Sequence, residues 1–285
     1  MFGRRNDGKE LKKVDAVFRL IPNFMVERSD AQVFFNEDIP IKEIDSYINA
    51  KAQEGIKLTL LDIIFAAIVR ILAEKPKINR FAANGRIYAR NDICLCITIK
   101  KSLSEESEES TLKVYFDGTE NVFQVRDKLQ EMIAANKGEA SNSGTDDTVN
   151  ALSKIPTGFL KFVVKFLRFL EKHNKIPKSL VKVSPFHTSA YVTNVGSLGI
   201  ESIYHHLYNF GTTSMFFAIG KKKKSYVFED EEIKEERCVN IAFVGDERIC
   251  DGYYYAHSFR TLAKYLRHPE MLETGAVERV KDPQL

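Results

Sequence analysis

The sequence lacks several features that mark common protein classes. Its four cysteines show no C-x-x-C spacing and no histidines at zinc-finger distances, so we expect no metal site. The N-terminal stretch MFGRRNDGKELKK has no apolar signal region, and no run approaches the roughly 20 apolar residues of a membrane-spanning helix. We therefore expect a reducing, cytoplasmic location.

An excess of charge of one sign is also lacking. The chain has 42 basic and 39 acidic residues spread along its length, which leaves a net charge of only +3. Nucleic-acid-binding domains usually carry a clustered basic surface, so we expect no nucleic-acid function. What the chain does have is 285 residues with 44% hydrophobic content, enough to bury a sizeable core.

Hydrophobic periodicity predicts strands and helices in mixed order. Residues 60–74 are apolar nearly all round and follow Thr59, with Asp62 three positions on, which predicts a capped core helix. Residues 86–100 predict a hairpin that leads into a strand, and residues 214–246 predict a long hairpin with a charged tip. This intermixing indicates an α/β or α+β protein with two layers.

Local composition predicts the domain boundaries. Residues 101–110 and 136–148 are polar and rich in Ser, Glu and Gly, which predicts mobile loops. We expect a flexible N-terminus over residues 1–14, one catalytic-type domain over 15–275, and a C-terminal tail over 276–285.

One predicted helix carries a narrow basic stripe. In TGFLKFVVKFLRFLEK, residues 157–172, the basic side chains recur at i, i+4, i+7 and i+11 among Phe, Leu and Val. Such a helix can lie on an anionic membrane surface or fill a groove of a partner. Alternatively it is buried in the protein's own core or in a subunit interface, with its basic edge reaching water, which we favour. The basic residues are Lys161, Lys165, Arg168 and Lys172.

The stretch Asp-Glu-Arg-Ile-Cys-Asp-Gly, residues 246–252, resembles the C-terminal signature of the 2-oxoacid dehydrogenase acyltransferases. The related chloramphenicol acetyltransferases share its H-x-x-x-D-G core. In these families the histidine takes the proton from the thiol or hydroxyl that attacks the acyl-CoA thioester, and the aspartate holds the loop. Asp251, Gly252 and Arg248 match the signature, whereas Glu247 stands at the histidine position.

A second motif, YVTNVGSLGI, resembles the T-x-[ST]-N-x-G-x-x-G strand and turn of the same enzymes. The resemblance places Thr193 at the hydroxyl that steadies the oxyanion, with Asn194 and Gly196 in the turn. With similar stretches upstream, it covers about residues 15–275 and implies a chloramphenicol acetyltransferase-like mixed sheet flanked by helices. It also implies a homotrimer with its site at a subunit interface.

The sequence departs from the family in two ways. It shows no lipoyl domain, and hence no covalent lipoyl group, so it corresponds to a catalytic domain standing alone. An ordinary glutamate, with a pKa of about 4.3, is also a poor base at neutral pH, although burial can raise such a pKa. Alternatively Glu247 pairs with Arg248, with Arg260 or with a lysine of a neighbouring subunit, and serves structure only. His205 and His206 are the best candidates for a replacement base.

These observations predict a CoA-dependent acyltransferase-like protein with altered or lost activity. Acyl-CoA would be its substrate, and the run Lys221–Lys224 could contact the CoA phosphates, although lysines at a hairpin tip are usually only solvated. The alternative is a catalytically silent trimeric scaffold or small-molecule binding protein that keeps the pocket.

Overall fold

The computed structural model describes residues 5–100, 109–136, 147, 150–151, 153–229 and 231–285. The predicted mobile loops 101–110 and 136–148 therefore fall mostly outside the described residues. Among the described residues, no helix has the length and apolar content needed to cross a membrane.

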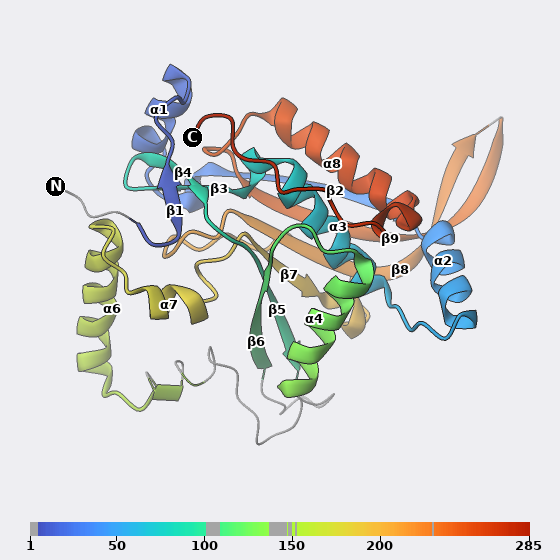
Figure 1. The fold of residues 1–285 in the computed structure, drawn as a ribbon, viewed down its shortest axis with the longest axis horizontal. Helices are drawn as coiled ribbons and strands as arrows, with labels where there is room; N and C mark the ends of the chain where they lie inside the picture. Colours follow the sequence, from blue (N-terminus) through green and yellow to red (C-terminus); the bar gives the residue numbers. More distant parts are fainter. Residues whose placement is uncertain (1–4, 101–108, 137–146, 148–149, 152, 230) are drawn as a thin grey trace.

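A six-stranded mixed sheet forms the centre of the molecule (Figure 1). Its strand order is β2-β9-β8-β7-β5-β6, in which the pairs β5–β7 and β7–β8 are parallel and the others antiparallel. The mixed sheet and its helices confirm the predicted fold class. The strands are β2 (Gln32–Pro40), β5 (Ile93–Lys100), β6 (Glu109–Phe116), β7 (Ala190–Asn194), β8 (Met215–Glu229) and β9 (Glu232–Asp246).

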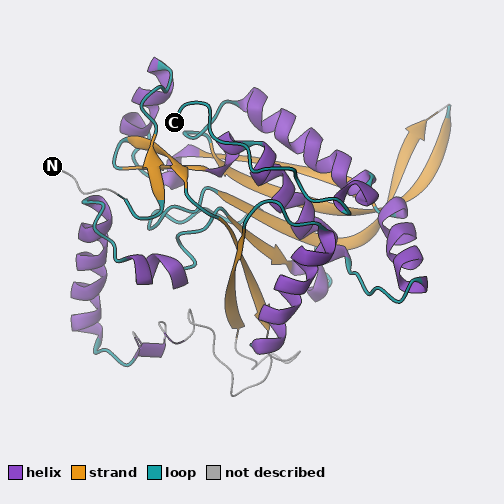
Figure 2. Cartoon of the chain, in the orientation of Figure 1, coloured by secondary structure: helices purple, strands orange, loops and turns teal. Residues whose placement is uncertain are grey.

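Helices cover one face of this sheet, and α3 (Leu60–Glu74) lies at the centre of that layer (Figure 2). Thr59 and Asp62 form the predicted capping box at its start. Phe65 and Ile68 are fully buried between the sheet and the neighbouring helices. These neighbours are α4 (Val122–Ala135) and α8 (Gly252–Arg267), and α2 (Lys42–Gln53) packs beside them.

The opposite face, here called the outer face, carries no such helical layer among the described residues. Tyr191 and Phe216 project there, since their neighbours along the strands belong to the core on the helix side. The segment 199–213 covers them, with Leu207 and Tyr208 in contact. This irregular segment thus helps to shield Tyr191 and Phe216 from solvent.

A second, three-stranded sheet corrects the predicted hairpin. Its order is β1-β4-β3, formed by β1 (Gly8–Glu10), β3 (Arg80–Ala83) and β4 (Arg86–Arg90), with α1 (Ala16–Phe24) against β4. The predicted hairpin over residues 86–100 is wrong, because β4 pairs with β3 and β1 while β5 pairs with β6 and β7.

The chain ends are more ordered than the sequence indicates. Strand β1 lies within the N-terminus that was predicted to be flexible, and Leu11 and Val14 are buried after it. In the predicted tail, Asp282 is buried and paired with Arg80 at 2.5 Å. Pairing partners distant in the sequence therefore fix both segments.

Helix α6 (Thr157–Lys172) stands at one side of the molecule, followed by α7 (Lys178–Val183) (Figure 1). None of its residues is buried, and Phe162 is 62% exposed. The prediction that this helix is buried in the protein's own core is therefore wrong. Packing against a neighbouring subunit is untested.

Residues Lys221–Lys224 do not lie at a hairpin tip. The β8–β9 turn falls between Glu229 and Glu232, whereas the lysines lie within β8 beside a register shift between Ile219 and Lys222. Lys222 pairs with Asp45 at 2.8 Å. The hairpin is longer than the lysine run suggested, because the acidic stretch that follows is also strand.

Candidate functional site

The loop that follows β9 is held by a buried ionic cluster. The Arg248 guanidinium donates to both carboxylate oxygens of Asp246, at 2.8 and 2.7 Å. Arg28 donates to the same carboxylate at 3.2 Å, and all three residues are at most 3% exposed. Burial lowers the pKa of Arg28 to about 10, which still leaves it charged at neutral pH. One buried carboxylate thus fixes the loop through two arginines.

Glu247 lies next to this cluster but takes no part in it. Its backbone N–H donates to the carbonyl of Ala31 at 2.9 Å, which continues the β2–β9 pairing by one residue. Its half-buried carboxylate makes no hydrogen bond or ion pair with any described residue. Within one chain, therefore, Glu247 does not pair with Arg248 or Arg260, whereas pairing with a lysine of a neighbouring subunit stays a prediction.

Asp251 and Gly252 connect the loop to α8. Asp251 is the N-cap of this helix, and its carboxylate accepts a hydrogen bond from the backbone N–H of Tyr254 at 2.8 Å. An aspartate at this position also interacts favourably with the helix dipole. The Tyr255 hydroxyl donates to the Asp246 carbonyl at 2.9 Å and ties the helix back to the loop.

The second motif lies at the carboxyl end of β7. Thr193 is half-buried, and strand alternation points it to the outer face with Tyr191. Asn194 caps the following turn by accepting from the Ser197 N–H at 3.3 Å. Gly196 packs so closely on β8 that a Cβ would approach the Gly220 carbonyl oxygen to 2.3 Å. A side chain at this position would therefore push the turn away from the sheet.

Within one chain, the register of the strands places the two motifs at opposite ends of the sheet. Thr193 lies opposite Ala218 in β8, and Ala218 lies opposite Ala242 in β9. Glu247 comes five residues after Ala242, so it lies about 16 Å further along the strands and about 10 Å across them. Thr193 and Glu247 therefore cannot act on one substrate within a single chain.

A cavity lies beside each motif. The one next to Glu247 has a volume of about 270 Å³ and is bordered by β2 and α8. The other has a volume of about 430 Å³ and is bordered by Asn194, Gly196 and Lys221, together with the start of α3. Each end of the sheet thus offers space for part of a ligand.

The histidine pair has other contacts. His205 stacks on Phe216 with ring centroids 4.1 Å apart, and its Nδ1 lies 2.8 Å from the His206 carbonyl oxygen. Burial lowers the pKa of His205. Neither histidine borders the cavity beside Glu247. In the part of the chain that the structure describes, no group of three or more metal-binding side chains is found.

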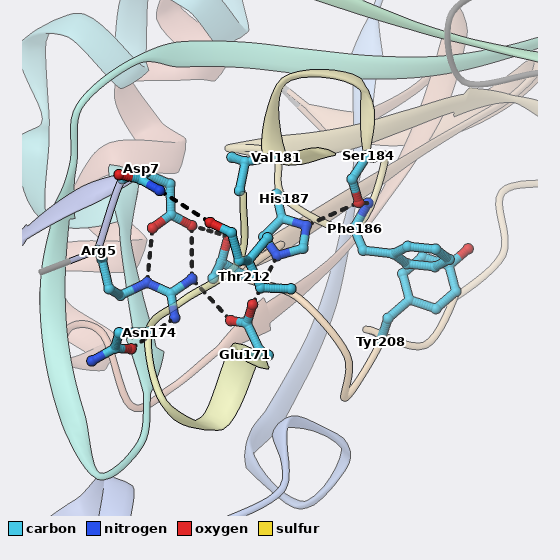
Figure 3. Close-up of polar contacts among 12 residues, drawn as sticks. Arg5, Asp7, Glu171, Asn174, Val181, Ser184, Phe186, His187, Tyr208 and Thr212 are labelled. Carbon is cyan, nitrogen blue, oxygen red and sulfur yellow. Dashed lines mark hydrogen bonds and ion pairs between the residues drawn. The ribbon is translucent and has the colours of Figure 1, made fainter. Parts of the chain in front are cut away.

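A buried polar network, which the sequence does not indicate, anchors α6 to the body (Figure 3). Glu171 lies near the end of α6, and its Oε2 is 3.1 Å from Nε2 of His187. Its other oxygen pairs with Arg5 at 2.9 Å, and Arg5 pairs with Asp7 at 2.7 Å. Burial alone would raise the pKa of Asp7, but Arg5 lowers it to about 2.

The network includes the order Ser184–His187–Glu171, which has the residue types of a nucleophile, a base and an orienting acid. The Ser184 hydroxyl lies 2.9 Å from Nδ1 of His187. His187 is only 1% exposed, and burial lowers its pKa. Neither Ser184 nor His187 borders the two cavities described above, so we interpret this array as structural.

With this geometry established, comparisons with known proteins can be placed on it. The family described as 2-oxoacid dehydrogenases acyltransferase (catalytic domain) matches residues 184–274. This stretch contains both motifs, the strands β7 to β9 and helix α8. No curated protein matches the sequence.

Solved structures resemble almost the whole chain. A probable dihydrolipoamide acetyltransferase from Listeria monocytogenes shares 15% identity with a TM-score of 0.54, over 92% of this chain and 95% of that one. The cubic core of a pyruvate dehydrogenase multienzyme complex shares 12% identity with a TM-score of 0.57, over 95% and 94%. A chloramphenicol acetyltransferase shares 10% identity with a TM-score of 0.53, over 91% and 99%.

These findings confirm the resemblance predicted from the two motifs. Residues 184–274 match the acyltransferase family, and the chain as a whole has the chloramphenicol acetyltransferase-like fold. At these identities the likeness of the solved structures establishes the fold alone, so the substrates and the assembly are taken up as proposals.

Proposed function

We propose that this protein is a CoA-dependent acyltransferase whose site forms between neighbouring protomers of a homotrimer. This proposal rests on the register of the strands, in which Thr193 and Glu247 of one chain lie at opposite ends of the sheet. A rotationally symmetric ring can bring one end of each protomer against the other end of the next. Each interface would then combine one Glu247 with one Thr193.

Each residue would have a distinct role. The Thr193 hydroxyl would donate a hydrogen bond to the oxyanion of the tetrahedral intermediate, a contribution typically worth about 10²–10³ in rate. Glu247 would accept the proton of the attacking acceptor. Asp251 and Arg248 would hold the loop, through the helix cap and the paired Asp246 carboxylate respectively.

The acyl donor would be acyl-CoA, bound as a substrate. Its phosphates are anionic, so the cavity next to Glu247 is the less suitable of the two for them. The cavity at the end of β7 has Lys221 and Lys222 at its border. Because Lys222 already pairs with Asp45, whereas Lys221 is 3.9 Å from its nearest carboxylate, Lys221 is the better phosphate ligand.

An exposed apolar patch supports assembly into a homotrimer. Five large side chains from β2 and from residues 198–204 are 41% to 58% exposed, and two of them, Phe34 and Tyr204, touch with ring centroids 5.7 Å apart. Such patches on soluble proteins commonly mark interfaces. The patch consists of Phe34, Leu198, Ile200, Ile203 and Tyr204.

Mixed trimers test the shared site. The purified protein is assayed with acetyl-CoA and a panel of thiols, alcohols and amines, and compared with Thr193→Ala and Glu247→Gln. Each variant alone should lose activity. When the two variants are co-expressed in equal amounts, about a quarter of the sites regain both groups, and activity should return to about that fraction.

The matched controls are Thr261→Ala and Glu131→Gln, which alter a hydroxyl and a carboxylate elsewhere and should keep full activity. Turnover by the wild type without recovery in the mixed trimers would contradict a site shared between protomers. A monomer in analytical ultracentrifugation would contradict the assembly itself.

Glu247 has a carboxylate at the position where the resembling families have an imidazole. This difference favours a second candidate, a catalytically silent trimeric scaffold or small-molecule binding protein. General acid–base catalysis typically supplies about 10²–10⁴ in rate, so loss of an effective base leaves a pocket with little chemistry. Binding of ligands without any acetylated product in the same assay would favour this candidate.

We also propose that α6 contacts an anionic membrane surface. Its exposed apolar side chains, among them Phe162 and Phe166, lie beside a face whose only charges are basic. None of the four basic side chains makes an ion pair with a described residue.

Co-sedimentation with vesicles that contain phosphatidylserine tests this contact. Binding should occur at low salt and weaken as salt is added, and Lys161→Glu combined with Lys165→Glu should reduce it. The matched control is Lys57→Glu combined with Lys75→Glu, which makes the same change in net charge outside α6. Equal binding to neutral vesicles, or no binding at all, would contradict the proposal.

A further inference from the structure

The cavity beside Glu247 combines one charge with an apolar lining. Its other lining residues are Val33, Phe35, Cys250, Gly252, Tyr255 and Ala256. Burial raises the pKa of the Cys250 thiol and that of the Tyr255 hydroxyl, so both are neutral at pH 7. Among the described residues that line the cavity, Glu247 is therefore the one that carries charge.

The two cations of the adjacent ionic cluster are not available to this carboxylate. Both Arg248 and Arg28 direct their guanidinium groups at Asp246, and Arg248 also donates to the carbonyls of Met25 and Val26 at 3.0 Å. The negative charge of Glu247 thus has no ion-pair partner among the residues that the structure describes. A half-buried carboxylate in this situation is complementary to a ligand that brings its own positive charge.

We propose that this cavity binds a small organic amine in its ammonium form, with the charged nitrogen on Glu247 and the apolar body between β2 and α8. The Phe35 and Tyr255 rings line the same space, and aromatic faces attract cations as well as apolar groups. A volume of about 270 Å³ lies just below the ~300–1,000 Å³ typical of ligand pockets, so the ligand is small.

As a statement about catalysis, this inference rests on the proposed function. The bound amine would then be the acceptor of the acyl group. The ammonium group would first lose a proton to Glu247, which passes it to water. The amine nitrogen would then attack the thioester carbonyl, so that a C–N bond forms and the C–S bond breaks. The second nitrogen proton would go to the departing sulfur, giving an amide, CoA thiol and one released proton.

A binding experiment tests the site without CoA. Isothermal titration calorimetry at pH 7 compares 2-phenylethylamine, 2-phenylethanol and phenylacetate, which share a phenyl group and differ in charge. The amine should bind about tenfold more tightly than the alcohol, a difference of about 1.4 kcal/mol, and phenylacetate should bind least. Added salt should narrow the difference, because it screens the ion pair.

Two variants separate charge from shape. Glu247→Gln should lower the affinity for the amine to that for the alcohol, whereas Glu131→Gln, on the surface of α4, should change neither. Ala256→Leu fills the cavity and should weaken binding of both compounds while the thermal unfolding temperature stays unchanged. Equal affinities for amine and alcohol, or an amine preference that survives in Glu247→Gln, would overturn the inference.

The acetyl-CoA assay distinguishes this inference from the proposed function. Amine binding that depends on Glu247, without acetylated product from any acceptor, would support the amine site and reject acyl transfer. Acetylation of thiols or alcohols by a protein that shows no amine preference would support acyl transfer and reject the amine site.

Discussion

Helices α3 and α6 have similar apolar side chains but opposite environments. Twelve of the 15 residues of α3 are buried, whereas none of the 16 residues of α6 is. Helix α3 is enclosed by the sheet, α4 and α8. Helix α6 is joined to the body near its C-terminal end, where Glu171 meets His187 and Arg5.

This comparison shows what hydrophobic periodicity can and cannot predict. In both helices the pattern of apolar residues correctly predicts helix formation. It does not determine what the apolar face contacts, because that depends on residues far away in the sequence. The charge pattern is the more informative difference, since the polar face of α6 is basic while α3 has hardly any polar face.

The largest effect expected is the loss of packing in α3. Phe65→Ala should lower the free energy of unfolding by about 3–5 kcal/mol, because it leaves a cavity in the core. Phe166→Ala in α6 should change it by no more than about 0.5 kcal/mol, because this side chain is half exposed. Urea denaturation measures both variants. Comparable losses would mean that α6 is packed in solution, which would break the comparison.

Acid should weaken the anchor of α6 through Asp7. Arg5 lowers the pKa of Asp7 to about 2, so its contribution is complete above about pH 4 and is lost as the pH falls through about 2. Between about pH 4 and pH 2, protonation of Asp7 should lower the free energy of unfolding by about 2 kcal/mol. Asp7→Asn should be less stable at pH 5 but should show a flatter pH dependence. The same pH dependence of the free energy of unfolding in the wild type and in Asp7→Asn would contradict the pairing of Asp7 with Arg5.

A smaller effect is expected when the anchor loses one charge. Glu171→Gln keeps the shape of the side chain but loses the ion pair with Arg5, which should cost about 1 kcal/mol. The last turn of α6 should then exchange its amide hydrogens faster. Lys172→Gln, one residue further on, is the control and should leave exchange unchanged. Equal exchange in both variants would show that Glu171 does not hold the helix.

Much of the fold follows from local sequence. The capping pattern of Thr59 and Asp62 and the apolar run after it predict α3 within its observed bounds. The family resemblance of residues 246–252 locates the loop and the helix that Asp251 caps. These signals lie within a few residues of one another, so they can be recognised without knowledge of the rest of the chain.

The parts that sequence reasoning missed depend on long-range pairing. Strand β4 lies two residues before β5 but joins another sheet, because β1 and β3 are its partners. Glu171 meets Arg5 across more than 160 residues. No local pattern marks such pairs. The catalytic roles of Thr193 and Glu247 stay predictions, because under the proposed function each residue acts with the other from a neighbouring protomer.

Because Thr193 and Glu247 lie at opposite ends of the sheet, activity under the proposed function would depend on the concentration of the protein. A solitary chain under the proposed function holds two incomplete halves, so turnover per molecule would fall on dilution as protomers separate. The abundance of the protein would then act as a control on its own output, with no regulator needed besides the protein itself.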